Sequence, residues 1–158
     1  MPTPDYTRAA IMAAETLIRF GIDSAPINPI PMIMQMPELV TLVSYTQLSD
    51  DIGIKRQDLM RTVASAPDAF SSVEIKNGKL HYIIAYNKKL GDNNHSLHCA
   101  VAREFGHVIL GHDGSRPYEV RQEEVRCFHH HLLSPRALIH MICVAYNGFT
   151  ENRKKNSR

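Results

Sequence analysis

The sequence has little net charge, no long apolar run and no leader-like segment at its start. Its 158 residues carry 18 lysines and arginines against 16 acidic residues, and this balance gives no sign of the basic face that nucleic-acid binding requires. No apolar stretch approaches the roughly 18 residues needed to span a bilayer, and no basic segment leads into an apolar core. We therefore expect a cytoplasmic protein that contacts neither a membrane nor nucleic acid.

Cysteine is also scarce. Cys99, Cys127 and Cys143 are odd in number, and no two of them form a C-x-x-C pair. This spacing predicts neither a disulfide framework nor a zinc site built on cysteines, and it is typical of a reducing compartment.

The length and the apolar content, 44% of the residues, are sufficient for one domain with its own core. No internal repeat is present. The last eight residues, "ENRKKNSR", read as a solvated basic tail. We therefore predict a domain over residues 1–150 and a disordered tail over 151–158.

Apolar residues recur at helical spacing in several segments. Ala9, Ala13, Leu17 and Phe20 predict a helix from residue 6 to 20, and the proline-rich stretch that follows predicts a loop or short helix with packed methionines. Further helices are expected over 55–64, 95–110, 119–131 and 137–146.

One segment has the alternating pattern of strands. In "SSVEIKNGKLHYIIAYN", alternating apolar residues flank Asn77 and Gly78, a pair suited to a tight two-residue hairpin turn. With the helices, this predicts an α+β domain in which helices surround a small, mostly antiparallel sheet.

The stretch "VAREFGHVILGHDG", residues 101–114, differs at one position from the zinc-protease motif H-E-x-x-H. Residues four apart on a helix point the same way, so Arg103 and His107 occupy the two metal-ligand positions, and Glu104 lies on an adjacent strip of the surface. His112 follows His107 by five residues, which on a helix would turn it about 140° away. We therefore do not expect His112 to share a metal with His107.

Such a zinc site needs a third protein ligand, commonly a carboxylate on the next helix. The stretch "EEVRCFHHHLLSP" provides Glu124 or its neighbour Glu123 at the start of the helix expected over 119–131. Of the three consecutive histidines in this stretch, at most one can face the site, and His131 is the candidate.

Together, "AREFGHVILGH" and "EEVRCFHHHLLSP" resemble the ImmA/IrrE metallopeptidases, a family of bacterial and phage proteins with a zincin-like fold. The resemblance implies zinc as the cofactor, Glu104 as the general base, His107 as the second metal ligand and Glu124 as the third, with Glu123 as the fallback. It also implies a role in gene regulation and a separate helix-turn-helix repressor as the protein partner.

The departure at the first ligand position decides the chemistry that we predict. Arginine remains protonated and has no lone pair for a metal, so Arg103 cannot replace the histidine. We predict that its guanidinium pairs with Glu124 or Glu104, standing in for the metal ion. Alternatively, a recruited ligand could restore zinc binding, and the candidates for it are Cys99, Cys127, His131 and His98.

Two functions follow from these alternatives. The first is a zinc metallo-endopeptidase-like protein with a degenerate metal site and impaired catalysis, a pseudoenzyme that acts on a repressor. The second is a non-catalytic module that binds a protein or peptide and sequesters a transcriptional regulator.

Overall fold

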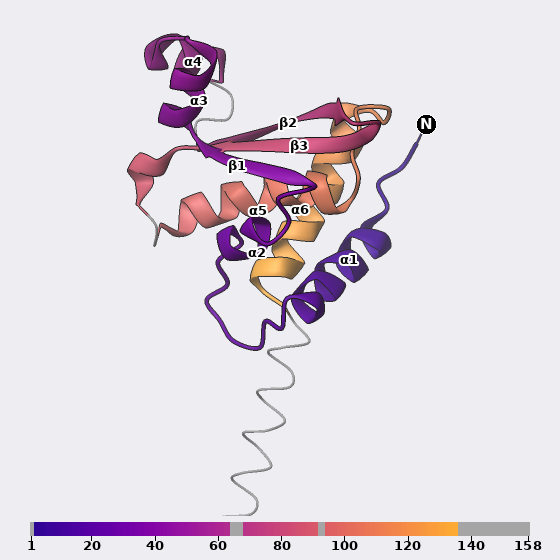
Figure 1. The fold of residues 1–158 in the computed structure, drawn as a ribbon. Helices are drawn as coiled ribbons and strands as arrows, with labels where there is room; N and C mark the ends of the chain where they lie inside the picture. The colour runs from indigo at the N-terminus through magenta and orange to yellow at the C-terminus, as the bar shows by residue number, and fades with distance from the viewer. Residues whose placement is uncertain (1, 64–67, 92–93, 136–158) are drawn as a thin grey trace, which may run out of the picture.

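The computed structural model describes residues 2–63, 68–91 and 94–135. Within these ranges a three-stranded sheet carries helices on one face (Figure 1). Helix α5 (His95–Ile109) packs on the sheet, helix α6 (Tyr118–Leu133) packs on α5, and helix α1 (Tyr6–Arg19) packs on α6. Among the described residues no helix is both long enough and apolar enough to cross a membrane.

Helix α1 forms because its apolar residues fall on one face. Asp5 caps its first turn by accepting a hydrogen bond from the backbone N–H of Arg8 at 2.8 Å, and Ala9, Ala13 and Leu17 are buried. Helix α2 (Ile30–Met34) follows with a proline in its first turn, which suits a residue without a backbone N–H.

The sheet has the order β1-β3-β2. Strands β2 (Ala69–Lys76) and β3 (Lys79–Tyr86) form the predicted hairpin, and Asn77 and Gly78 both have positive φ angles in its turn. Strand β1 (Val40–Ser44) pairs with β3 in parallel. The sheet is therefore mixed, whereas the sequence predicted a mostly antiparallel one.

Three short helices complete the described fold. Helices α3 (Tyr45–Ile52) and α4 (Arg56–Thr62) lie at one end of the sheet (Figure 1), and η1 (Lys88–Leu90) follows β3. Tyr45 stacks on Phe70 of β2 at 5.7 Å between ring centroids and belongs to a small second core.

Helices α5 and α6 meet closely at Gly106. A Cβ atom at Gly106 would lie 3.0 Å from the ring of Phe128 and 3.2 Å from Val125, both on α6. Phe128 also packs edge-on against Phe105. This close approach brings the two motif-bearing helices together, and their buried residues form the main core with α1 and the sheet.

Most of the expected elements are confirmed within a few residues: the first helix, the helix at 55–64, the hairpin and both motif helices. The α+β class is confirmed as well. Strand β1 and helix α3 were not predicted. The helix expected over 137–146 and the tail over 151–158 lie outside the described residues.

Candidate functional site

A cavity of about 420 Å³ lies between β2 and the paired helices α5 and α6. Three residues of the motif, Arg103, Glu104 and His107, line it from α5. The structure therefore places the predicted general base and the first two predicted ligand positions on the wall of one cavity.

Glu104 faces strand β2. Its Oε2 accepts a hydrogen bond from the Ser71 hydroxyl at 2.5 Å. Burial raises the pKa of Glu104, and the hydrogen bond from Ser71 and the charge of Arg103 offset only part of this effect. A carboxyl group with a raised pKa beside a cavity can exchange a proton with a bound molecule.

His112 lies against His107, contrary to the prediction that it points away. The two Nδ1 atoms are 2.9 Å apart, and both side chains are buried. The helix was predicted to end at residue 110, but the angle between His107 and His112 was taken from helical geometry, which does not hold beyond that end. Gly111 has a left-handed φ of +66°, which ends the helix and turns the chain back.

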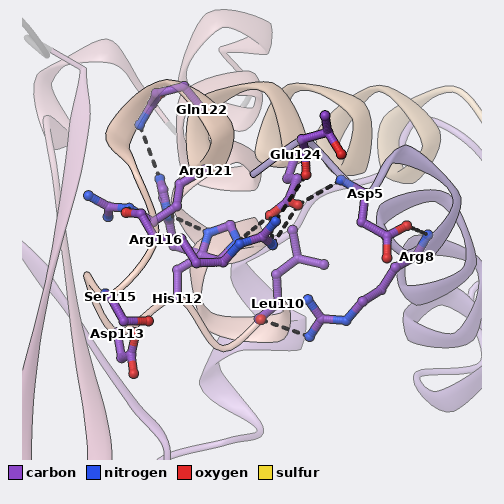
Figure 2. A network of polar contacts seen from close by, with 12 residues as sticks. Asp5, Arg8, Leu110, His112, Asp113, Ser115, Arg116, Arg121, Gln122 and Glu124 are labelled. Carbon is purple, nitrogen blue, oxygen red and sulfur yellow. Dashed lines mark hydrogen bonds and ion pairs between the residues drawn. The ribbon is translucent and has the colours of Figure 1, made fainter. Parts of the chain in front are cut away.

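Glu124 is 1% exposed, and four hydrogen bonds hold its carboxylate (Figure 2). The Arg116 Nη1 atom donates to both oxygens at 2.6 and 2.8 Å, the Asp5 backbone N–H donates at 2.7 Å, and His112 Nε2 lies 2.9 Å away. Burial alone would raise the pKa of Glu124, but these donors lower it. The group is therefore a carboxylate at neutral pH.

The ionised Glu124 determines the direction of the hydrogen bonds that link it to His112 and His107. Because a carboxylate only accepts, His112 donates from Nε2 and, being neutral, accepts at Nδ1 from the Nδ1–H of His107. His107 Nε2 then carries a lone pair, 3.4 Å from the amide nitrogen of Gln122. The result is a chain of oriented groups that runs from the cavity wall to the buried carboxylate.

The position of Arg103 corrects a second prediction. Among the described residues no ion pair joins Arg103 to Glu124 or Glu104, and its Nη2 donates instead to the Gln122 side chain at 3.1 Å. The arginine that holds Glu124 is Arg116, from the loop before α6. Sequence reasoning missed Arg116 because it belongs to neither motif.

The start of the chain closes over this carboxylate (Figure 2). Besides the bond from the Asp5 backbone, Arg116 Nη2 donates to the carbonyl of Thr3 at 3.2 Å. One turn into α1, Arg8 donates to the carbonyl of Leu110 at 2.9 Å. We call residues 3–5 the N-terminal strap, since they lead into α1 and contact Arg116 and Glu124.

The other proposed ligands lie elsewhere. Cys127 and His131 line a second hollow on α6, where the Cys127 thiol is 3.5 Å from the carbonyl of Tyr6. Cys99 contacts His95, one turn earlier on α5, at 3.5 Å. The fallback ligand Glu123 pairs with Arg126 on the surface of α6. His98 is not among the residues that line the cavity.

These residues do not fit a zinc ion in their present arrangement. In the described ranges, no three His, Cys, Asp or Glu side chains are grouped so that they could hold a metal. His112 separates His107 from Glu124, since it uses one ring nitrogen for each of them. The three groups that donate the four hydrogen bonds to Glu124, Arg116 Nη1, His112 Nε2 and the Asp5 N–H, would compete with a metal for the Glu124 oxygens.

Comparisons with protein-family models, with curated proteins and with solved structures find no match to this chain.

The buried histidine pair predicts a loss of stability in mild acid. Burial, followed by the charges of His112, Arg121 and Arg103, lowers the pKa of His107 to about 4 from the ordinary 6.5. Above pH 6.5 the folded and unfolded states both hold a neutral imidazole. Between pH 6.5 and 4 only the unfolded state takes up the proton, so the free energy of unfolding falls by up to about 1.4 kcal/mol per pH unit.

Urea unfolding at pH 7, 6 and 5 measures this slope. We expect His107→Gln to flatten it, and His130→Gln, which removes an exposed histidine on α6, to leave it unchanged. A wild-type stability that stays constant from pH 6.5 to 4.5 would contradict the assignment of a neutral His107.

Proposed function

We propose that this protein is a metal-independent relative of the ImmA/IrrE peptidases that binds a segment of a partner protein without hydrolysing it. The observation that carries this proposal is the state of Glu124. The carboxylate that the resemblance assigns as a zinc ligand is bound by Arg116, His112 and the Asp5 backbone, while Arg103 stands at the first ligand position. In the described site, the Glu124 oxygens are thus engaged by protein donors, and a guanidinium takes the place of the first ligand.

Strand β2 supplies an edge to which a peptide can bind. Among the described strands only β3 pairs with β2, and no described strand pairs with its other edge. The Asn87 N–H donates to the Asp68 carbonyl at 2.9 Å, which marks this pair as hydrogen-bonded. By the alternation of an antiparallel ladder, Ser71, Val73 and Ile75 direct their N–H and C=O groups outward.

An extended segment that added to this edge would lie beside the cavity. Residues 68–73 of the chain line the cavity, and the exposed part of β2 begins at Ser72. Backbone hydrogen bonds would supply affinity, and side chains entering the cavity would supply selectivity. The resemblance points to a helix-turn-helix repressor, encoded separately, as the protein that provides the segment.

The rival function is zinc-dependent hydrolysis of the same segment, with Glu104 as the base. Its place beside the cavity and its raised pKa favour a role in proton transfer. This function requires a metal, and the described site offers no group of ligands for one. We therefore place binding first.

Panning a phage-displayed library of random seven-residue peptides tests the binding function. We expect enrichment on the wild-type protein and a loss of at least tenfold on Val73→Pro, because proline removes one outward N–H without disturbing the ladder to β3. Val73→Ala keeps that N–H and is the matched control. The proposal fails if no peptide is enriched over the bare support, or if Val73→Pro retains the same peptides as Val73→Ala.

A further inference from the structure

The cavity contains a buried donor without a partner. Tyr82, on β3, is 2% exposed and lines the cavity, and its hydroxyl makes no hydrogen bond within the described part of the chain. Buried hydroxyl groups in proteins nearly always have a partner, since an unpaired one is costly. An unpaired hydroxyl at a cavity wall is therefore available to a bound acceptor.

In the described residues, two guanidinium groups that line the same cavity make no direct ion pair. Over the ranges described, neither Arg103 nor Arg121 has a carboxylate oxygen within 4.0 Å. Arg103 donates to the neutral amide of Gln122, and Arg121 donates from Nε to the carbonyl of Arg116. The remaining donors of both groups can reach a ligand.

The acidic residues of the cavity are already engaged. Glu104 accepts from Ser71, and Asp68 accepts from the Ser96 hydroxyl at 3.1 Å. Neither carboxylate is paired with a cavity arginine. The remaining N–H donors of Arg103 and Arg121 are therefore not used by these two carboxylates.

The charge of Asp113 acts on Tyr82, and the charge of Arg121 acts on Asp113. Burial, and then the charge of Asp113, raises the pKa of Tyr82. The pKa of Asp113 is in turn lowered, chiefly by hydrogen bonds from Ser115 and to a lesser extent by Arg121. One carboxylate thus lies near both groups, although it makes no hydrogen bond to either of them.

We propose that the cavity binds the carboxylate of an aspartate or glutamate side chain carried by the segment that pairs with β2. This inference rests on the proposed binding function and adds the chemical class of the recognised residue. The Tyr82 hydroxyl donates one hydrogen bond, and the guanidinium groups of Arg121 and Arg103 supply the opposite charge. Side chains of an extended segment alternate, so a single acidic residue can enter the cavity while its neighbours remain outside.

The sequences selected from the random library give the first test. On the wild-type protein we expect one position of the enriched peptides to be aspartate or glutamate. A synthetic copy of an enriched peptide is then compared with its Gln or Asn analogue by calorimetry. Because charge-assisted hydrogen bonds are lost, the analogue is expected to bind at least tenfold more weakly.

Two variants show whether the named residues cause this preference. In Tyr82→Phe/Arg121→Gln we expect the acidic peptide to lose its advantage, leaving less than a threefold difference from the analogue. Arg126→Gln makes the same change of charge on the exposed side of α6, outside the cavity, and is expected to keep the full difference. Tyr82→Phe alone retains the ring in the core and should melt no lower than the wild type.

The outcomes separate the two proposals. Enriched peptides with no acidic position, or an analogue that binds as tightly as the acidic peptide, overturn the carboxylate site and leave binding along β2 intact. A preference that requires a free C-terminal carboxylate also overturns it, since the source proposed here is a side chain. A complete lack of enrichment removes the binding function itself.

Discussion

Replacing Arg116 by alanine is expected to lower the free energy of unfolding by about 3 kcal/mol at pH 7, because the buried carboxylate of Glu124 loses its only arginine partner among the described residues. Glu124 is 1% exposed, so solvent cannot replace the lost charge. The donors that remain, His112 and the Asp5 backbone, are neutral and compensate only in part. Urea unfolding followed by circular dichroism measures the change.

A matched control uses the second ion pair on α6. Arg126 and Glu123 are 2.8 Å apart, with side chains 68% and 37% exposed, so Arg126→Ala should cost less than about 1 kcal/mol. Glu124→Gln removes the buried charge, and in that background Arg116→Ala should cost much less than in the wild type. Equal losses for Arg116→Ala and Arg126→Ala would show that Arg116 does not hold Glu124.

Replacing Arg103 by histidine is expected to restore the H-E-x-x-H spacing without restoring a zinc site. In the single variant, Arg116 still holds both oxygens of Glu124, and His112 still lies between Glu124 and His107. We therefore expect less than about one tenth of a zinc ion per chain after dialysis against a mild chelator. Elemental analysis of protein purified without a histidine tag gives the value.

A zinc site also requires that Glu124 be freed from its hydrogen bonds to Arg116. In Arg103→His/Arg116→Met the carboxylate is freed from the competing guanidinium, and zinc affinity should rise at least tenfold above that of the single variant. Arg103→Gln/Arg116→Met lacks the added ligand and serves as the control. Stoichiometric zinc in the wild type, or in Arg103→His alone, would contradict our description of the site and reopen the hydrolytic function.

Local patterns in the sequence were enough to predict most helices and the hairpin. Apolar spacing located α1 and α5, and the Asn77-Gly78 pair located the turn between β2 and β3. These signals are local, because periodicity and turn conformation depend on neighbouring residues. Strand β1 has only five residues, and its parallel partner lies about forty positions away, so no local pattern identified the pairing.

In the candidate site too, local sequence patterns predicted some of the residues but not the contacts between distant ones. The motif spacing placed Arg103, Glu104 and His107 together on α5, and the cavity contains all three. The hydrogen bond between His107 and His112 depends on the left-handed Gly111 that follows the end of α5, where helical geometry no longer applies. Tyr82 lies on β3, and nothing in its strand pattern distinguishes a cavity wall from ordinary core.

The N-terminal strap has a consequence for the order of folding. Asp5 and Glu124 are separated by 119 positions, yet the backbone of one caps the carboxylate of the other. Contacts across so long a loop form late, because the entropy of closing the loop must be overcome first. During synthesis, residues 3–5 cannot make their contacts until α6 has been made. The hairpin and α5 can therefore assemble before the Asp5 N–H donates to Glu124. The hydrogen bonds around Glu124 are therefore complete only when the whole domain has folded. Hydrogen exchange of the Asp5 backbone N–H would measure when this happens.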